Sequence, residues 1–255
     1  TTCAVTPSGT VKCWGGSDFG QLGDNDEVMA ALTDSSKKFK SAPVTVANLN
    51  GIKQVAVGYN HACAISQTGS VSCWGDNSRG QIGDGTTTFR PQATPVVGLS
   101  AKVTQLALTY QSSCALLETG AVQCWGGNTQ GELGVGQTAK LNQSTSPKSV
   151  VLLNNVTIKR LVSGRQHLCG ITNSDTLVCW GWNDSGQLGL AVPNSDPISV
   201  DTSARFIPTA VTSVGSGIQQ VAAGYGHTCA VRANDTVCWG DNSKGQLGNG
   251  VTSTS

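Results

Sequence analysis

The chain has 255 residues, of which 38% are hydrophobic and 12% are charged, and its formal net charge at pH 7 is +1. This length and apolar content allow one well-buried domain, and the near-zero charge argues against a nucleic acid as partner. Every apolar run is strand-sized, so we expect no membrane insertion. The first residues, "TTCAV", already lie inside a repeat without a signal peptide, which suggests a processed product or an excised fragment.

Five copies of one unit divide the chain. Each copy ends in Cys-Trp-Gly, and the successive tryptophans lie 60, 51, 55 and 59 residues apart. The copies are numbered first to fifth by these residues: Trp14, Trp74, Trp125, Trp180 and Trp239. A period of this size indicates a repeat architecture.

Short strands rich in Val, Ile and Ala are predicted throughout, and no stretch is typical of a helix. In chain order, the predicted strands of the second copy are a ("APVTVANL", 42–49), b ("IKQVAVG", 52–58), c ("HACAIS", 61–66) and d ("SVSCWG", 70–75). The predicted fold class is therefore all-β.

In each copy, strands c and d form a predicted hairpin whose two cysteines face each other. Four copies leave three-residue loops whose last residue suits the left-handed conformation: Pro7-Ser8-Gly9, Gln67-Thr68-Gly69, Glu118-Thr119-Gly120 and Asn173-Ser174-Asp175. The cysteines of the fifth copy are one residue closer. Its turn, around Ala233-Asn234-Asp235, therefore has to differ or contain a bulge.

Directly opposed residues of an antiparallel pair lie roughly 4.5 Å apart at Cα, a distance that a disulfide accepts. The predicted disulfides are Cys3–Cys13, Cys63–Cys73, Cys114–Cys124, Cys169–Cys179 and Cys229–Cys238. They indicate an oxidising compartment: secreted, periplasmic or at the cell surface. Reduced core cysteines and a zinc site are the alternatives. The even count at one spacing argues against the first, and the absence of closely spaced ligand pairs argues against the second.

A second motif follows each Trp-Gly: "GSDFGQLG" (16–23), "DNSRGQIG" (76–83), "GNTQGELG" (127–134), "WNDSGQLG" (182–189) and "DNSKGQLG" (241–248). Together with the "GYNH" and "GYGH" turns, these motifs resemble the regulator-of-chromosome-condensation repeat family over nearly the whole chain. The resemblance implies a β-propeller of four-stranded antiparallel blades. The cysteines depart from the nuclear nucleotide-exchange factor of this family, so its activity is not carried over. Secreted bacterial members are more similar, which implies a bacterial source and a protein-binding surface.

With blades taken as a-b-c-d, the chain contains a c-d half blade followed by four complete blades. Residues 1–255 are then a single β-propeller domain or an arc of a larger one. Because strands a and b of the first blade are missing, we expect either further residues to close the ring or an open edge that pairs with another chain, including self-assembly.

Two sets of recurring side chains are interpreted as structural. His61, His167 and His227 lie two residues before a cysteine, where the third copy has Ser112, and their dispersal over separate blades predicts no metal site. The five Cys-Trp-Gly tryptophans are expected to pack between blades. Trp182 differs, because the other copies have Gly or Asp at its position, and it is a candidate contact residue. The Asp- and Asn-rich loops lack the ligand pattern of a calcium loop and are interpreted as Asx turns.

The predicted binding face carries the b-c turns and the d-a loops, which lie at the same ends of the strands in an antiparallel meander. Length differences between copies fall mainly in the d-a loops 23–42, 83–94, 134–147 and 189–208, and variable loops on one face often mark a binding side. The candidate binding residues are Tyr59, Phe89, Tyr110, Arg165, Trp182 and Tyr225. Because Phe39, Phe89 and Phe206 precede prolines, loop packing is the alternative role for these phenylalanines.

No unrepeated nucleophile, base or carboxylate pair stands out, so neither a catalytic residue nor a cofactor is predicted. The favoured function is a non-enzymatic extracellular protein-binding or adhesive propeller whose partner is a protein or another cell-surface component. The alternatives are a structural subunit of a surface assembly or filament, a sugar-binding lectin, and a hydrolase or lyase.

Overall fold

The computed structural model describes residues 1–26, 39–136, 141–153, 156–190 and 202–252. Parts of three predicted d-a loops therefore lie outside the described residues. The chain divides into two compact units. The first comprises residues 1–119, 123–128 and 141–148, and the second comprises residues 120–122, 129–140 and 149–255.

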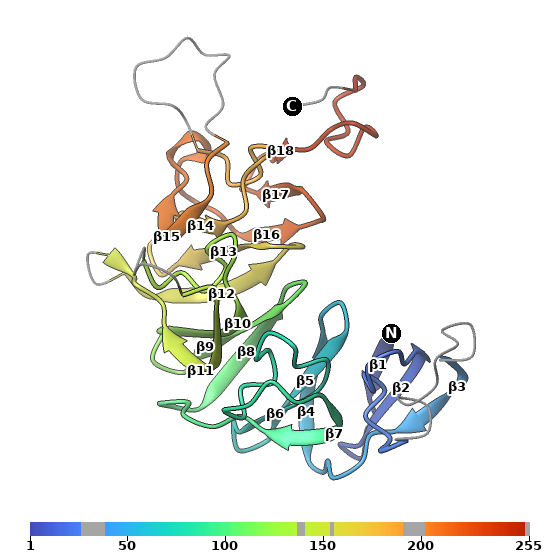
Figure 1. The fold of residues 1–255 in the computed structure, drawn as a ribbon. Helices are drawn as coiled ribbons and strands as arrows, with labels where there is room; N and C mark the ends of the chain where they lie inside the picture. Colours follow the sequence, from blue (N-terminus) through green and yellow to red (C-terminus); the bar gives the residue numbers. More distant parts are fainter. Residues whose placement is uncertain (27–38, 137–140, 154–155, 191–201, 253–255) are drawn as a thin grey trace. The chain divides into compact units, whose positions relative to one another are not determined.

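The described residues form 18 β-strands in five sheets (Figure 1). The first sheet contains β1 (Thr2–Val5), β2 (Val11–Gly16) and β3 (Phe39–Thr45). The second contains β4 (Ile52–Val57), β5 (His61–Ser66), β6 (Val71–Gly75) and β7 (Arg90–Pro95). The third contains β8 (Val103–Leu108), β9 (Ser112–Leu117), β10 (Val122–Gly127) and β11 (Gln143–Ser149).

The fourth sheet contains β12 (Ile158–Ser163), β13 (His167–Thr172), β14 (Leu177–Gly181) and β15 (Arg205–Ala210). A short 3₁₀ helix, η3 (Thr212–Val214), follows β15. The fifth sheet contains β16 (Gln220–Ala223), β17 (His227–Val231) and β18 (Thr236–Gly240). Within the described part of the chain, no helix is both long and apolar enough to cross a membrane.

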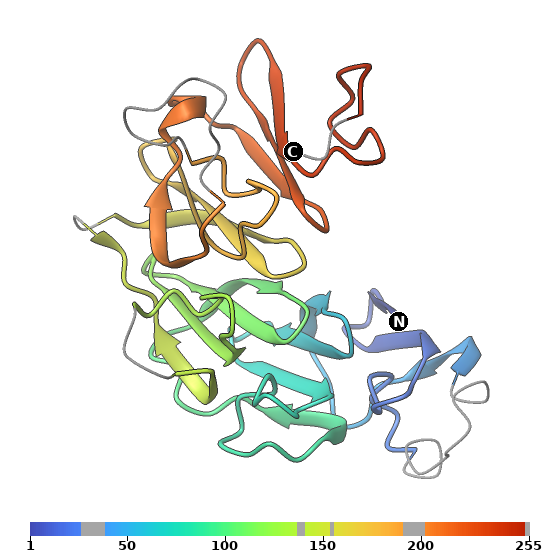
Figure 2. The same ribbon diagram turned by 45° about the horizontal axis from the view of Figure 1, so that its top comes forward.

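The predicted strands are present, but their grouping into blades is corrected. Strand d pairs with the strand a that follows it, as β6 pairs with β7, so each four-stranded sheet has the order b-c-d-a, while the first sheet is c-d-a and the fifth is b-c-d (Figure 2). The described strands therefore form three four-stranded and two three-stranded sheets, where the sequence predicted four complete blades and a half blade. The d-a connection is a hairpin with a long loop, and a register shift between Cys73 and Gly75 bends strand d where this hairpin opens.

The c-d hairpins confirm the predicted disulfide pairs. Cys63 faces Cys73 in the register of β5 and β6, and in all five pairs the Cα atoms lie 4.0 to 4.1 Å apart. Every cysteine of the chain is paired. Asp175 has the left-handed conformation expected of it, with φ of 58°. Each bridge closes a short loop and, in the chain-entropy model, stabilises the fold by about 2 to 3 kcal/mol.

The fifth hairpin shows how it accommodates one residue fewer. Val231 faces Thr236, and the Arg232 N–H donates to the Asp235 carbonyl at 2.9 Å. Its turn therefore consists of two residues, Ala233 and Asn234, and the strands contain no bulge. The prediction that this turn must differ is confirmed, with Asp235 belonging to the paired flank.

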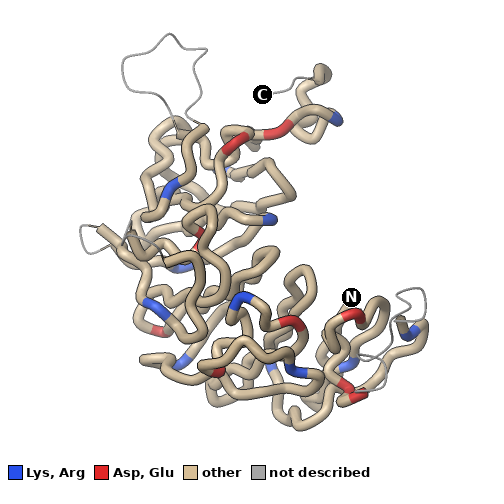
Figure 3. The backbone as a smooth tube through the Cα atoms, viewed as in Figure 1, with Lys and Arg blue, Asp and Glu red and all other residues tan. Residues whose placement is uncertain are grey.

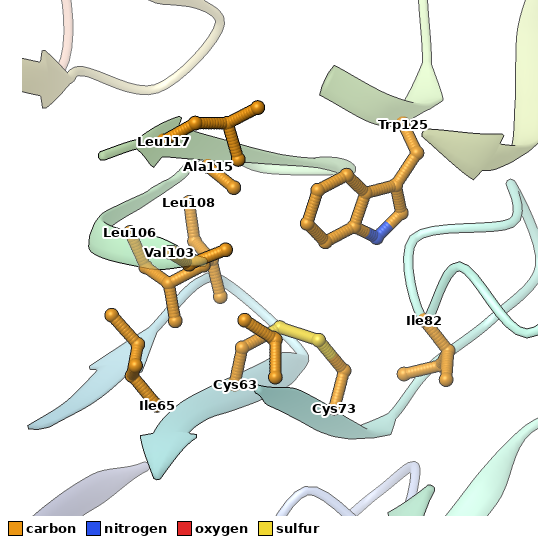
Figure 4. Close-up of a cluster of buried hydrophobic side chains, with 11 residues drawn as sticks. Cys63, Ile65, Cys73, Ile82, Val103, Leu106, Leu108, Ala115, Leu117 and Trp125 are labelled. Atoms are coloured by element: carbon orange, nitrogen blue, oxygen red, sulfur yellow. A yellow bond between two sulfur atoms is a disulfide. The ribbon is translucent and has the colours of Figure 1, made fainter. Parts of the chain in front are cut away.

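The hydrophobic core fills the space between neighbouring sheets of a unit. In the first unit, Trp125 from β10 lies beside Ile82 and the Cys63–Cys73 disulfide of the preceding copy (Figure 4). The Trp125 indole N–H donates to the Gln81 carbonyl at 2.9 Å. A Cβ on Gly83 would lie 2.7 Å from the indole nitrogen, so only glycine lets the ring approach this closely. The tryptophan of the next copy thus packs onto the Gly-Gln-Leu-Gly motif, which is Gly-Gln-Ile-Gly in the second copy. This agrees with the prediction that these tryptophans pack between blades.

Candidate binding face

The four b-c turns present one outward side chain each. In the second copy, the Gly58 N–H donates to the His61 carbonyl at 2.8 Å, which closes a tight turn around Tyr59 and Asn60. The same bond closes the other turns, from Thr109 to Ser112, from Gly164 to His167 and from Gly224 to His227. The second residue of each turn is Tyr59, Tyr110, Arg165 or Tyr225; Tyr59 and Tyr225 are exposed, and Tyr110 and Arg165 are half-buried.

In the first unit, two of these side chains contact each other. The ring centroids of Tyr59 and Tyr110 lie 4.5 Å apart with a tilt of 44° between the ring planes. Tyr59 is 62% exposed although it makes this contact. The pair therefore forms a firm aromatic surface that remains open to solvent.

In the second unit, a cation and two rings come together. The Arg165 guanidinium carbon lies 4.4 Å from the centroid of the Tyr225 ring, within cation-π range. The Trp182 ring meets Tyr225 edge-on, with centroids 6.1 Å apart and an interplanar angle of 82°. Tyr225 is 60% exposed. The indole lies close to Gly226, because a Cβ on this glycine would lie 3.7 Å from the ring, at ordinary van der Waals distance.

Backbone bonds join the start of each d-a loop to the neighbouring b-c turn. The Trp182 N–H donates to the Gln166 carbonyl at 2.9 Å, and the Asp76 N–H donates to the Asn60 carbonyl at 2.8 Å. Turn and loop therefore lie at the same ends of the strands, as predicted. This register places the non-repeated Trp182 beside the b-c turn that carries Arg165.

The three phenylalanines are less closely connected with this surface. Phe89 precedes β7 and is 42% exposed. Phe39 and Phe206 were expected in loops, but Phe39 begins β3 and Phe206 lies within β15. Of the six candidate binding residues, the structure brings five into two clusters, which we call the tyrosine pair (Tyr59, Tyr110) and the arginine cluster (Arg165, Trp182, Tyr225). Phe89 belongs to neither.

An asparagine that sequence reasoning missed fixes the d-a loop to the blade. The Asn77 Oδ1 accepts the Ile82 N–H at 3.0 Å, while its Nδ2 donates to the Thr88 carbonyl at 2.9 Å. Asn183 and Asn242 form the same pair of bonds in the fourth and fifth copies. The sequence signal for this role was the recurrence of Asn in "DNSRGQ", "WNDSGQ" and "DNSKGQ". The structure explains the recurrence, because each of these side chains bonds two separate positions of its loop.

The predicted Asx turns are present beside it. The Asp76 Oδ1 accepts the Ser78 N–H at 2.9 Å, and Asp241 does the same for Ser243. Among the described residues, no group of three or more His, Cys, Asp and Glu side chains is arranged to hold a metal ion.

Glu132 occupies the place where the other copies have glutamine. It is buried, and burial raises the pKa of its carboxyl group. Its Oε2 accepts the Gln130 N–H at 2.8 Å, and its Oε1 accepts the Gln166 side-chain amide at 3.2 Å. Glu132 thereby connects the loop after β10 with the b-c turn that carries Arg165.

Two of the three histidines that were interpreted as structural form equivalent bonds to the next copy. The His61 Nε2 lies 2.9 Å from the Ser113 hydroxyl, and the His167 Nε2 lies 2.9 Å from the Thr228 hydroxyl. Both rings are buried, and burial lowers the pKa of each to about 4.

Charge does not concentrate on either cluster. Figure 3 shows Lys, Arg, Asp and Glu scattered along the described chain. An open cavity of about 570 Å³ in the first unit lies by the c-d turn, away from the tyrosine pair, and Lys102 is the one charged residue that lines it. This lining contains neither a carboxylate nor a histidine to act as a general base.

The repeated hairpins, the seated tryptophans and the tight turns agree with one family model, described as the RCC1-like domain, which matches residues 1–255. The chain belongs to this family. The ultraviolet-B receptor UVR8 of Arabidopsis thaliana is 29% identical over 97% of this chain and 52% of its own length. The probable E3 ubiquitin-protein ligase HERC6 of Homo sapiens is 31% identical over 89% of this chain and 21% of its own length. The chain thus spans about half of one curated relative and a fifth of the other.

Solved RCC1-like structures show the same fold. Human WBSCR16 superposes with a TM-score of 0.80 at 19% identity, covering 96% of this chain and 60% of its own. Prp20p of Saccharomyces cerevisiae superposes with a TM-score of 0.78 at 23% identity, covering 98% of this chain and 58% of its own. The chain is therefore a disulfide-bonded RCC1-like β-propeller chain, and its five bridges indicate an oxidising compartment.

Proposed function

We propose that this RCC1-like chain is a non-enzymatic extracellular binding module, whose partner is a protein or another cell-surface component. It acts within one propeller domain, or an arc of a larger one, over residues 1–255. The partner binds the face that carries the b-c turns and d-a loops. The observation that supports this proposal most directly is the presence of two side-chain clusters on hydrogen-bonded turns, the tyrosine pair and the arginine cluster, each with one exposed tyrosine.

The chemistry of the two clusters suits a protein interface. Tyr, Trp and Arg are the residues most enriched among interface hot spots. Tyr59 and Tyr225 are more than half exposed, yet each is held by a neighbouring side chain, so little side-chain entropy is lost when a partner covers them. The loops beside them vary in length between copies and are fixed at their base by Asn77 and its equivalents.

The binding partners of related proteins are compatible with a protein partner. The yeast member has been crystallised bound to Kap60, and the study of Prp20p describes its binding to Gsp1p and histones. The proposal takes from these proteins the use of the fold as a protein-binding surface and none of their partners.

The test is to isolate partners by crosslinking the protein to native cell-surface and extracellular fractions, then to measure affinity for single variants. Tyr59→Ala, Tyr225→Ala and Trp182→Gly should each weaken binding at least about tenfold, as hot-spot losses do. Trp182→Gly installs the residue that the first and third copies have at this position.

Matched controls come from the c-d turns at the other ends of the strands. Gln67→Ala and Glu118→Ala should leave the affinity unchanged. If these two variants abolish binding while the three aromatic variants do not, the site lies at the c-d turns and the proposed face is wrong.

A further inference from the structure

A chain of hydrogen bonds in the first unit runs from a b-c turn into the following blade. The Ser113 hydroxyl, on β9, donates to the Gln81 carbonyl at 2.9 Å, and this carbonyl also accepts the Trp125 indole N–H. Because the one hydroxyl hydrogen is used in this bond, Ser113 can only accept from His61. The His61 Nε2 must therefore carry the hydrogen, which fixes the neutral tautomer.

The second unit repeats the arrangement. The Thr228 hydroxyl, on β17, donates to the Gln187 carbonyl at 2.8 Å, and the Trp239 indole donates to the same oxygen at 2.9 Å. His167 then donates from its Nε2 to Thr228. Two histidines thus connect their own b-c turns to a hydroxyl of the next copy in the same way.

The other ring nitrogen has nothing to bind. The Nδ1 atoms of His61 and His167 are buried without a hydrogen-bond partner. As bare acceptors they are tolerated, but a proton placed there would be a buried, unpaired donor carrying a charge. The neutral form of each histidine is therefore the one that the fold accommodates.

Each ring also lies directly under its turn. A Cβ on Gly58 would lie 2.5 Å from the His61 Cε1 and 2.9 Å from the Thr109 carbonyl oxygen, and a Cβ on Gly164 would lie 2.2 Å from the His167 Cε1. The glycine that precedes Tyr59, or Arg165, therefore rests on the imidazole. If a protonated ring moved into contact with water, the turn that lies against it would also have to move.

The charged groups around the two rings differ. Asp76 favours a charged His61, but its carboxylate already accepts the Ser78 N–H and the Gln81 amide, and burial dominates the pKa. Near His167, the position of Asp76 is taken by Trp182, and His227 further lowers the pKa. Glu132 faces the same turn through Gln166.

The third copy shows a version of the turn that does not titrate. Ser112 replaces the histidine and Thr109 replaces the glycine, and their hydroxyls lie 2.5 Å apart. The turn still presents Tyr110. The fourth copy has Leu168 at the position of Ser113 and Thr228, and therefore lacks the hydroxyl. It follows the third copy, which is the copy among the second to fourth without the histidine.

We propose that His61 and His167 are acid-sensitive struts, whose protonation frees the b-c turns from the following blade and releases a partner held on the clusters. The release of a partner rests on the proposed function, whereas the loosening of the turns does not. Acidification between pH 6 and 4 is the signal to which these struts respond.

The experiment compares wild-type protein with a triple variant, Gly58→Thr, His61→Ser and Ser113→Leu. This variant gives the turn of the second copy the residue types that surround the turn of the third copy. With a pKa of about 4 in the fold and 6.5 as the ordinary value, one strut should change the unfolding equilibrium constant roughly 60-fold between pH 7 and pH 4.5. Urea titrations should show a smaller acid response in the triple variant than in the wild type, by about this factor, because His167 remains in both proteins. Hydrogen exchange of residues 58–61, corrected for the intrinsic pH effect, should rise about tenfold in the wild type alone.

The matched control is Ser112→Ala in the third copy, which alters a b-c turn that has no histidine. This variant should keep the wild-type acid response. Should the triple variant fail to fold at pH 7, ring-nitrogen NMR of the wild type decides: both imidazoles must stay protonated at Nε2 alone down to about pH 5.

Equal acid responses in the wild type and the triple variant, or rings that titrate near pH 6.5, would overturn the proposal. If the turns loosen in acid but an identified partner remains bound, the proposed binding face fails while the struts stand.

Discussion

The b-c turns of the second and third copies present the same side chain by different means. Tyr59 is carried by a glycine that rests on a buried imidazole, and Tyr110 is carried by a threonine bonded to a serine. The two tyrosines nevertheless contact each other. The two copies have the same outward residue, but the residues beneath it differ together: glycine occurs with histidine, and threonine occurs with serine. We therefore expect that exchanging either supporting residue alone destabilises the turn.

Substituting the supporting glycine should have the largest effect. Gly58→Ala places a Cβ against the His61 ring and the Thr109 carbonyl, and we expect a loss of about 3 kcal/mol in the free energy of unfolding. Thr109→Ala in the third copy should cost less, about 1 to 2 kcal/mol, because it removes only the local contacts of one hydroxyl with the hydroxyl, carbonyl and N–H of Ser112. Urea unfolding at pH 7 measures both, and equal losses would contradict the close approach.

Removing the imidazole comes next. His61→Ser should lower the free energy of unfolding by about 2 kcal/mol at pH 7, since a cavity opens and the Ser113 acceptor loses its donor. The sign of the pH dependence follows from the lowered pKa. The stability that neutral His61 provides is complete above pH 6.5 and is lost as the pH falls toward 4, by about 3 kcal/mol in total.

The difference between wild type and His61→Ser should therefore shrink, and then reverse, on acidification. Unfolding curves at closely spaced pH values from 7 to 4 will show the crossing. Parallel curves would mean that the ring is not desolvated as described.

The coupling between His61 and Ser113 should be smaller again. A double-mutant cycle with His61→Ser and Ser113→Ala should give an interaction energy of about 1 kcal/mol, the usual value for one buried hydrogen bond. As a comparison, Ser112→Ala combined with Ser113→Ala tests two neighbours on β9 whose hydroxyls bond different residues, and the two effects should be additive.

The outward tyrosines themselves should matter least to stability. Tyr59→Ala removes a tilted ring contact at a mostly exposed position, and we expect less than about 1 kcal/mol in the free energy of unfolding. A larger loss, measured by thermal or urea unfolding, would show that the tyrosine pair is structural.

Much of the fold follows from patterns within one copy. The cysteine spacing predicts the register of the c-d hairpin, and the last residue of each loop predicts the left-handed position, including Asp175. These features are local, so the distances involved are set by strand geometry and turn chemistry alone.

What the sequence could not decide lies between copies. Strand a can pair with the strand d before it or join the blade after it, and the choice depends on how the long d-a loop folds back from the bend after Cys73. The meeting of Tyr59 with Tyr110, or of Arg165 with Tyr225, depends on the spacing of successive blades, which no residue pattern encodes directly. The equal recurrence of the turns indicated which residues face outward but not which of them touch.

The bond from His61 to Ser113 also bears on how such arrays can grow. A histidine in one copy is followed by a hydroxyl in the next, as with His167 and Thr228, whereas Ser112 is followed by Leu168. Duplicating the second or the fourth copy would set an imidazole against Ala62 or Leu168, whereas duplicating the fifth copy would keep the pair, because it has both His227 and Thr228. A new copy therefore fits into such an array only where the hydroxyl position of its successor matches its own histidine position.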